Sequence, residues 1–276
     1  AKGASVLHQL VAHVGRPQFI AGLQKYFAKH AWGNTTLNDL LVELEAASGR
    51  KLDTWVHTWL QTAGVNTLRP QLEIDGDTYT SVVISQETPL VPAGSKELRP
   101  HRLAVGLYDI SGDSLNLRKS VELDVVGAST VVTELAGEKV ADLLLINDRD
   151  LSYAKLRFDD RSIATLKKYL GRLNDPLARA LSWAAIWDMH RDAQISSADF
   201  IEIALSGLAG ENDDAIVNIV ISQLGTSVEG YASDANRDKY RERLAAGFWN
   251  LMQSSAPASD LQLLYSRAFA ANAHTP

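Results

Sequence analysis

The stretch GVNTLRPQLEIDGDTYTSVVIS, residues 64–85, marks a change in the spacing of apolar residues. Before it, apolar residues recur about every 3.6 positions, which predicts helices, and within it they alternate, which predicts strands. Leu72 and Ile74 lead into the turn Asp75-Gly76-Asp77, and residues 78–85 are rich in β-branched side chains. The stretch therefore predicts a boundary between a helical segment and β-structure.

Residues 1–66 carry the signals of an all-helical segment. The positions that share a helical face are Val6, Leu7, Leu10 and Val11, then Phe19, Leu23 and Phe27, then Leu40, Leu41 and Leu44, and finally Trp55 and Trp59. The start and stop signals are Pro17, a capping box from Thr36 to Asp39, Gly49, Asp53 as an N-cap, and Gly64. We expect short helices separated by turns.

In residues 67–150, apolar and polar side chains alternate instead. The alternating positions are Leu103, Val105 and Leu107, and then Val121, Leu123 and Val125. Gly112-Asp113 between them is a hairpin signal, and ADLLLIND at 141–148 is expected to be the last buried strand. Strands without intervening helices predict a small antiparallel β-sandwich.

The helical period returns after about Asp159 and continues to the end of the chain. Asp175-Pro176 is an N-cap followed by a first-turn proline, Ser196 or Ser197 caps the next helix, and Asp213 with Asp214 starts another. A longer helix is expected over residues 234–253. Such helices predict stacked antiparallel pairs of solenoid type, although no strict repeat is present.

Composition narrows the classes of partner. The net charge of −6 argues against a nucleic-acid or anionic-membrane partner, and the basic residues of 237–243 are interleaved with acids, as on a solvated helix face. No apolar run approaches the ~20 residues of a membrane-spanning helix. The absence of cysteine excludes disulfides, thiol nucleophiles and Cys-ligated zinc, and is compatible with a cytoplasmic protein.

The search for chemistry finds no catalytic set. None of the seven histidines lies in His-Glu-x-x-His; His8 and His13 are five residues apart, off a common ligand face, and His57 is expected to point away from the face of Trp55 and Trp59. Surface or partly packed histidines are the expectation. We predict no catalytic, cofactor-binding or metal-binding residue in this chain.

Two other motifs have a structural interpretation. GTSVEG at 225–230 has Glu229 where a nucleophile elbow needs glycine and no strand before it, so a helix-ending turn is expected. The acidic positions Asp148, Asp150, Asp159 and Asp160 lack the spacing of a calcium loop. A junction loop with helix caps is predicted there.

One long stretch resembles a known family. Residues 26–66 are similar to the region that follows the zinc site in the aminopeptidase N family of zinc metallopeptidases. The matching positions are His30, Gly33, Asn34, Asp39, Leu40, Ala47 to Gly49, Trp55, Trp59, Leu60 and Gly64 to Asn66. The resemblance continues at residues 145–159 and 175–189, which look like the junction and first helix of the family's C-terminal helical domain.

The resemblance implies a division of the chain into three parts. These are the helical tail of a thermolysin-like catalytic domain (1–66), a β-sandwich (67–150) and an incomplete α-helical C-terminal domain (151–276). Ala1, Lys2 and Gly3 match the end of a Tyr-x-Lys-Gly motif, in which Lys2 and Gly3 set the backbone of the tyrosine. The zinc ligands, that tyrosine and the segment that holds the substrate amine would all lie upstream.

The resemblance thus implies a fragment of an enzyme that removes N-terminal amino acids from peptides. The parent would use zinc, while this chain would supply spacer and cavity-capping domains, be inactive alone, and have the missing N-terminal and catalytic portion as its partner. One alternative is a non-enzymatic module that binds peptide or protein on a concave surface. A complete enzyme of unfamiliar chemistry is a weaker possibility.

Overall fold

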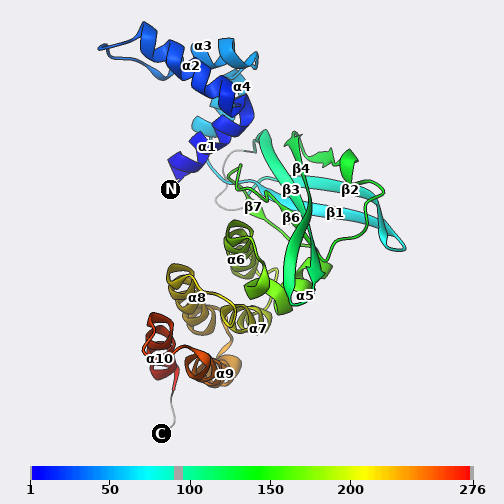
Figure 1. Ribbon diagram of the computed structural model, residues 1–276, viewed down its shortest axis with the longest axis vertical. Coiled ribbons are helices and arrows are strands. Elements are labelled where there is room, and N and C mark those ends of the chain that lie inside the picture. Colours follow the sequence, from blue (N-terminus) through cyan, green and yellow to red (C-terminus); the bar gives the residue numbers. More distant parts are fainter. Residues whose placement is uncertain (1, 90–95, 274–276) are drawn as a thin grey trace. The chain divides into compact units, whose positions relative to one another are not determined.

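The change of period at residues 64–85 coincides with the change from helix to strand in the computed structural model, which describes residues 2–89 and 96–273 (Figure 1). Ala1 and the side chain of Lys2 lie outside the described residues, so the expectation for the start of the chain stays untested there. Two units are distinguished by their internal contacts. Unit 1 comprises Ala1–Gly106, Ser120–Val140 and Ile146–Leu156, and unit 2 comprises Leu107–Lys119, Ala141–Leu145 and Arg157–Pro276.

Among the residues that the structure describes, four helices precede the first strand. They are α1 (Lys2–Val14), α2 (Arg16–Lys29), α3 (Leu37–Ser48) and α4 (Asp53–Leu60). α2 and α3 run beside each other (Figure 1), and Gly22 permits their approach, because an added Cβ would lie 3.1 Å from the carbonyl oxygen of Glu43. The expected all-helical segment is therefore present.

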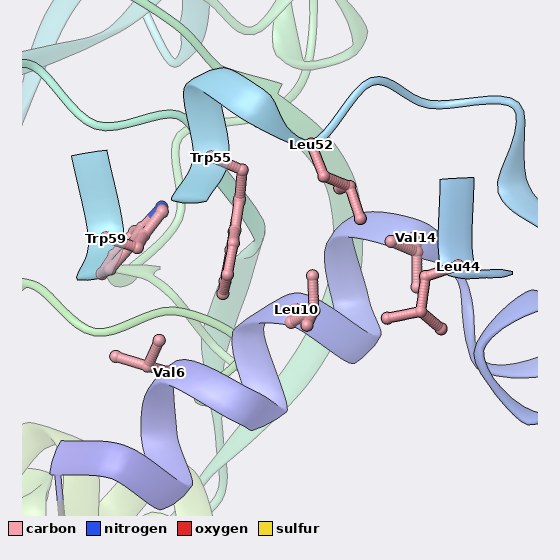
Figure 2. Packing of buried hydrophobic residues seen from close by; sticks show 7 residues of the cluster. All are labelled: Val6, Leu10, Val14, Leu44, Leu52, Trp55 and Trp59. Atoms are coloured by element: carbon pink, nitrogen blue, oxygen red, sulfur yellow. The ribbon is translucent and has the colours of Figure 1, made fainter. Parts of the chain in front are cut away.

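A small apolar cluster holds these helices together. Figure 2 shows Val6, Leu10 and Val14 on one face of α1, directed towards α3 and α4. The other members of the cluster are Leu44, Leu52, Trp55 and Trp59. Trp55 and Trp59 stack with their ring centroids 6.5 Å apart. The periodicity of α1 and α4 is thus explained by burial against each other.

The helix ends agree with the sequence signals in most places. At α3 the Thr36 N–H donates to the Asp39 carboxylate over 2.8 Å, and Gly49 takes the left-handed conformation with φ 70°. The expected cap at Asp53 is wrong, because α4 is preceded by Leu52 and no side chain caps it. Instead the Glu45 carboxylate accepts from the Leu52 N–H at 2.7 Å. α4 also ends four residues before Gly64.

Within the described part of the chain, the strands form two small sheets. The strands are β1 (Thr67–Asp75), β2 (Thr78–Glu87), β3 (His101–Ser111), β4 (Ser114–Val125), β5 (Ser129–Val131), β6 (Leu143–Ile146) and β7 (Lys155–Leu156). Their orders are β5-β2-β1-β7 and β4-β3-β6. The two predicted hairpins are confirmed, since Gly76 and Gly112 each lie between consecutive strands with φ 59°.

Two expectations about the strands need correction. The first sheet is mixed rather than wholly antiparallel, because β7 pairs with β1 in parallel at Thr67 and Leu68. β6, within the predicted strand 141–148, is buried along its whole length but is followed by β7 and so is not the last strand. Ile74, near the hairpin end of β1, is 48% exposed, and a register shift lies between Glu73 and Ile74 in the β1–β2 pair.

The helices after the strands lie in unit 2. They are α5 (Asp160–Tyr169), α6 (Pro176–Arg191), α7 (Ser197–Leu208), α8 (Asp214–Thr226), α9 (Asp234–Ser254) and α10 (Asp260–Asn272). The predicted caps are confirmed: the side chains of Asp175, Ser196 and Asp213 each accept from a backbone N–H of the first turn. Sequence signals therefore place the starts of α6, α7 and α8 correctly.

Glycines allow the backbone after α5 to contact the end of α7. A Cβ on Gly171 would lie 2.2 Å from the Gly207 carbonyl oxygen, and one on Gly210 would lie 2.3 Å from the Gly171 carbonyl oxygen. No real side chain fits at such distances, so both positions require glycine. Among the described helices, none is long and apolar enough to cross a membrane.

Candidate functional site

The histidines considered as ligands do not come together. His8 is exposed, with Nδ1 3.2 Å from the Asp150 carbonyl oxygen. His13 lies 3.4 Å from an Arg50 nitrogen, and burial, with the Arg50 charge second, lowers its pKa. His57 is exposed beside the buried Trp55 and Trp59, as its spacing predicts. Two histidines contradict the expectation of surface or partly packed positions, because His101 and His190 are buried.

The acidic residues of the junction have separate structural roles. Asp159 caps α5 by accepting from the Ser162 N–H at 3.1 Å. Asp148 is buried and accepts from the Ser120 hydroxyl at 3.3 Å. Asp150 has a left-handed backbone with φ 51°, and burial raises its pKa. The prediction of caps at this junction is confirmed for Asp159.

The described residues do not fit a metal site. Within 2–89 and 96–273, no three histidine, aspartate or glutamate side chains are close enough to hold an ion. Structural and catalytic zinc sites need at least three protein ligands. This part of the chain therefore offers no complete set of ligands for a zinc ion.

The Ser227 segment differs from its predicted form. Residues Ser227–Tyr231 continue α8 as a π-helix rather than as a simple turn. The Ser227 hydroxyl is buried and finds no hydrogen-bond partner within the part of the chain that the structure describes. A helix precedes it, whereas a nucleophile elbow needs a strand followed by a helix. The geometry does not support acyl-transfer chemistry at Ser227.

A buried polar joint connects α1 and α4 to the segment before β3. The indole of Trp55 donates to Gln9 Oε1 at 2.6 Å, and Gln9 in turn donates to the Pro100 carbonyl oxygen at 3.3 Å. The Trp59 indole donates to the same carbonyl at 3.1 Å. Because buried polar groups are costly unless they are paired, this network specifies one arrangement of the two helices on residues 96–100.

Arg99 is the centre of the joint. Its guanidinium donates to the Thr58 carbonyl oxygen at 2.8 Å, to Asn66 Oδ1 at 3.0 Å, to the Thr62 hydroxyl at 2.7 Å and to the Ala63 carbonyl oxygen at 3.2 Å. These acceptors are the C-terminal end of α4 and the chain just after it, where carbonyl groups lack helical partners. Burial lowers the Arg99 pKa. Arg99 thus binds the free acceptors at the end of α4, where the sequence predicted a helix end marked by Gly64.

His101 extends the joint into β3. Its Nε2 donates to Gln86 Oε1 at 2.9 Å, which leaves Nδ1 to accept from the Ser152 hydroxyl at 2.5 Å. This neutral tautomer satisfies both ring nitrogens, and burial, with the Arg99 charge second, lowers the pKa of His101 to about 3. His101 therefore acts as a neutral structural residue at physiological pH.

Unit 2 has its own buried polar centre. The Glu211 carboxylate is fully buried and accepts from Arg179 Nε and from the Trp183 indole, both at 3.0 Å. Its other oxygen accepts from the N–H groups of Asn212 and Asp213 at 3.0 and 3.2 Å. All four donors act together to offset the cost of burying the charge.

Sequence reasoning missed both centres. Gln9 could have been found, because it interrupts the apolar stripe that Val6, Leu10 and Val14 form on α1. Arg99, His101 and Glu211 carry no local signal, since the side chains that pair with them lie at least 15 residues away in the sequence. Polar pairings of that kind depend on the tertiary fold.

Comparison with known proteins identifies the family. Residues 1–59 match the family model described as "Peptidase family M1 domain", and residues 143–275 match "ERAP1-like C-terminal domain". Aminopeptidase N of Streptomyces lividans is 46% identical over 281 residues, covering 100% of this chain and 33% of that protein. The chain belongs to the aminopeptidase N family.

More distant relatives agree with this assignment. The tricorn protease-interacting factor F2 of Thermoplasma volcanium is 22% identical, over 81% of this chain and 25% of that protein. The crystal structure of Legionella pneumophila aminopeptidase A in complex with aspartic acid matches with a TM-score of 0.56 at 16% identity, over 98% of this chain and 34% of that one, and so shows the fold. This aminopeptidase N family chain spans about a third or less of the length of these relatives and corresponds to their C-terminal region.

Proposed function

We propose that this chain is the C-terminal part of a zinc aminopeptidase that removes N-terminal amino acids from peptides. The observation that supports this most strongly is the 46% identity to aminopeptidase N of Streptomyces lividans along the whole chain. The zinc, the residues that act on the peptide bond and the pocket for the substrate amine belong, in this proposal, to the rest of the same protein. That rest is the chain's partner, and the cytoplasm is its proposed location.

The proposed division of labour follows the three sequence segments. Residues 1–66 complete the catalytic domain, residues 67–150 form a β-sandwich spacer, and residues 151–276 form a solenoid-like helical domain that covers the cavity and excludes folded substrates. The joint around Arg99 supports the first boundary, because it ties the end of α4 to the residues before β3 with four hydrogen bonds. A spacer can hold the catalytic helices in place only if such a connection is rigid.

A chimera tests the proposal. In Streptomyces lividans aminopeptidase N, the region that aligns with this chain is replaced by residues 1–276. We expect the chimera to bind zinc and to hydrolyse aminoacyl amides in a chelator-sensitive manner, with a mock purification as the control for host aminopeptidases. The isolated chain should bind no zinc and show no rate above that control.

Two results would contradict the proposal. A chimera that folds and binds zinc but hydrolyses none of a panel of aminoacyl amides would show that the chain cannot serve as this part of the enzyme. Chelator-sensitive turnover by the isolated chain, with stoichiometric zinc, would show that histidines and carboxylates of this chain form a site of their own.

A further inference from the structure

The beginning of the chain has a charge pattern of its own. Residues 1–38 contain the cations Lys2, Arg16, Lys25 and Lys29 and no aspartate or glutamate, although the whole chain has a net charge of −6. Lys29 is paired with Glu43 at 3.2 Å. Arg16 and Lys25 are exposed and form no ion pair with any residue that the structure describes. α1 and α2 thus present positive charge that the rest of the chain does not neutralise.

One side of α2 combines this charge with exposed apolar side chains. Arg16, Ile20 and Phe27 are spaced four and seven residues apart, which places them within about 40° of one another around the helix. Ile20 is 46% exposed and Phe27 is 64% exposed. Only Gly22 of α2 is buried. Large apolar side chains grouped in this way are typical of a surface that another surface covers.

A cleft of about 550 Å³ continues this side of α2 towards α1. Its α1 wall includes His8 and Val11, its α2 wall includes Arg16 and Ile20, and Leu151 and Glu122 complete it. Glu122 is already engaged by Arg149 at 2.7 Å and by Arg102 at 3.4 Å. The Glu122 carboxylate in the cleft is therefore already paired, and the Arg16 guanidinium remains able to bind an acidic group of another surface.

We propose that the α1–α2 face, defined by His8, Val11, Arg16, Ile20 and Phe27, docks against an acidic and apolar surface of the remaining part of the M1 peptidase domain. This inference rests on the proposed function. The occupant is indicated by two observations. The M1 domain family model matches only residues 1–59, the segment that carries the face, and a carboxylate offsets the cost of covering a cation placed among apolar groups.

Hydrogen exchange of the α2 amides measures the docking directly. Covering Ile20 and Phe27 suppresses local opening of the helix, so exchange of α2 should slow at least about tenfold from the isolated chain to the chimera described above. Two variants remove the contacts, Arg16→Glu and the double substitution Ile20→Ser with Phe27→Ser. We expect either one to return α2 exchange in the chimera towards the rate of the isolated chain, in which these side chains are already exposed.

A matched control comes from Ile74 in β1 and from Val126, which directly follows β4. Ile74→Ser with Val126→Ser removes side chains that are 48% and 63% exposed, almost the same as Ile20 and Phe27. This variant should leave α2 exchange in the chimera unchanged. Equal effects of the two double variants would overturn the assignment of the face.

The remaining outcomes each overturn the inference in a recognisable way. A chimera that hydrolyses aminoacyl amides while α2 exchanges as fast as in the isolated chain would leave the proposed function standing and remove the docking face. Concentration-dependent protection of α2 in the isolated chain would identify a second copy as the occupant. Cosedimentation with phosphatidylserine vesicles that Arg16→Glu abolishes would identify an anionic lipid surface. An inactive chimera with unprotected α2 would contradict both proposals.

Discussion

The α1–α4 helices and the α5–α10 helices differ in how many of their residues are buried. The fourteen-residue α2 has Gly22 as its buried residue, whereas the twelve-residue α7 buries six, Phe200, Ile201, Ile203, Ala204, Gly207 and Leu208. Exposed large apolar side chains of residues 1–66 are Leu7, Ile20, Phe27, Trp32, Leu37, Val42 and Leu60. A helix surrounded by neighbours can bury a wide face, whereas a helix in a small cluster buries a narrow one.

The two groups of helices also differ in how their polar centres hold an arginine. Among the residues that the structure describes, those that accept hydrogen bonds from Arg99 are neutral, while Arg179 in α6 faces the fully buried Glu211 carboxylate. Removing either arginine leaves acceptors without donors. Only at Arg179 does it leave a buried charge, so substitutions at the two sites separate a packing role from a charge role.

The largest effect is expected for Arg179→Met. The substitution leaves the buried Glu211 carboxylate without its cationic partner, which lowers the free energy of unfolding by about 3–5 kcal/mol. Urea unfolding monitored by tryptophan fluorescence measures the loss. Arg172→Met removes the partner of the exposed Asp113 and should change stability by less than about 0.5 kcal/mol. A loss below about 1 kcal/mol at Arg179 would show that water reaches Glu211.

Gly171→Ala tests the close packing of the α5–α10 helices. The new Cβ would lie 2.2 Å from a backbone oxygen that cannot rotate away, so we expect a loss of about 3 kcal/mol. Gly225→Ala in α8 has nothing within 4 Å of its new Cβ and should stabilise the protein by about 0.5–1 kcal/mol. Opposite signs in urea unfolding support the contact, and equal stabilisation would exclude it.

Some of this packing is visible in the sequence and some is not. Asp175-Pro176 and Ser196 predict helix starts, because a capping side chain bonds backbone groups only a few residues away. Gly76 and Gly112 predict hairpins, because the positive φ of a tight turn is also a local requirement. The sequence around Gly171 does not predict that glycine is required, since the requirement comes from the close contact with the Gly207 carbonyl oxygen at the end of α7. Tertiary contacts decide that position.

The joint around Arg99 is a harder case. Burial of Trp55 and Trp59 follows from their helical spacing, which the sequence shows. Their indole N–H groups, however, are paired with Gln9 and Pro100, which lie 46 and 41 residues away. The sequence could predict the apolar part of the joint but not its hydrogen bonds. Donor and acceptor meet only once the helices and strands are assembled.

Arg99→Met tests the joint itself. Four acceptors at the end of α4 lose their donor and have only limited access to water, which costs about 2–3 kcal/mol. Hydrogen exchange of residues 58–66 should accelerate, while exchange of α6 and α7 should stay unchanged. Uniform acceleration over both units would mean that the joint stabilises the whole chain rather than the connection of α4.

The pH dependence of stability should report His101. Its pKa in the folded protein is about 3, against 6.5 when unfolded, so the unfolded chain binds the extra proton between these values. The contribution of His101 to the free energy of unfolding is therefore fully present above pH 6.5 and is lost as the pH drops towards 3. From pH 7.5 to 5.0 this loss is about 2 kcal/mol. His101→Gln should reduce the difference between the two pH values by that amount in urea unfolding. An unchanged difference would show that another group causes it.

The smallest effect compares equivalent caps in the two groups of helices. The Ser196 hydroxyl accepts from the Asp199 N–H at 3.1 Å, and Ser196→Ala should cost about 1 kcal/mol. Thr36→Ala keeps the backbone N–H that bonds Asp39 and removes the hydroxyl contact at 2.8 Å, so its cost should be smaller. Hydrogen exchange of α3 and α7 measures each helix separately. If the α1–α4 helices open locally more often than the α5–α10 helices, as their narrow burial implies, α3 exchanges faster than α7 even in the unsubstituted chain. Equal protection of α3 and α7 would mean that four short helices around seven apolar side chains are sufficient without any covering surface.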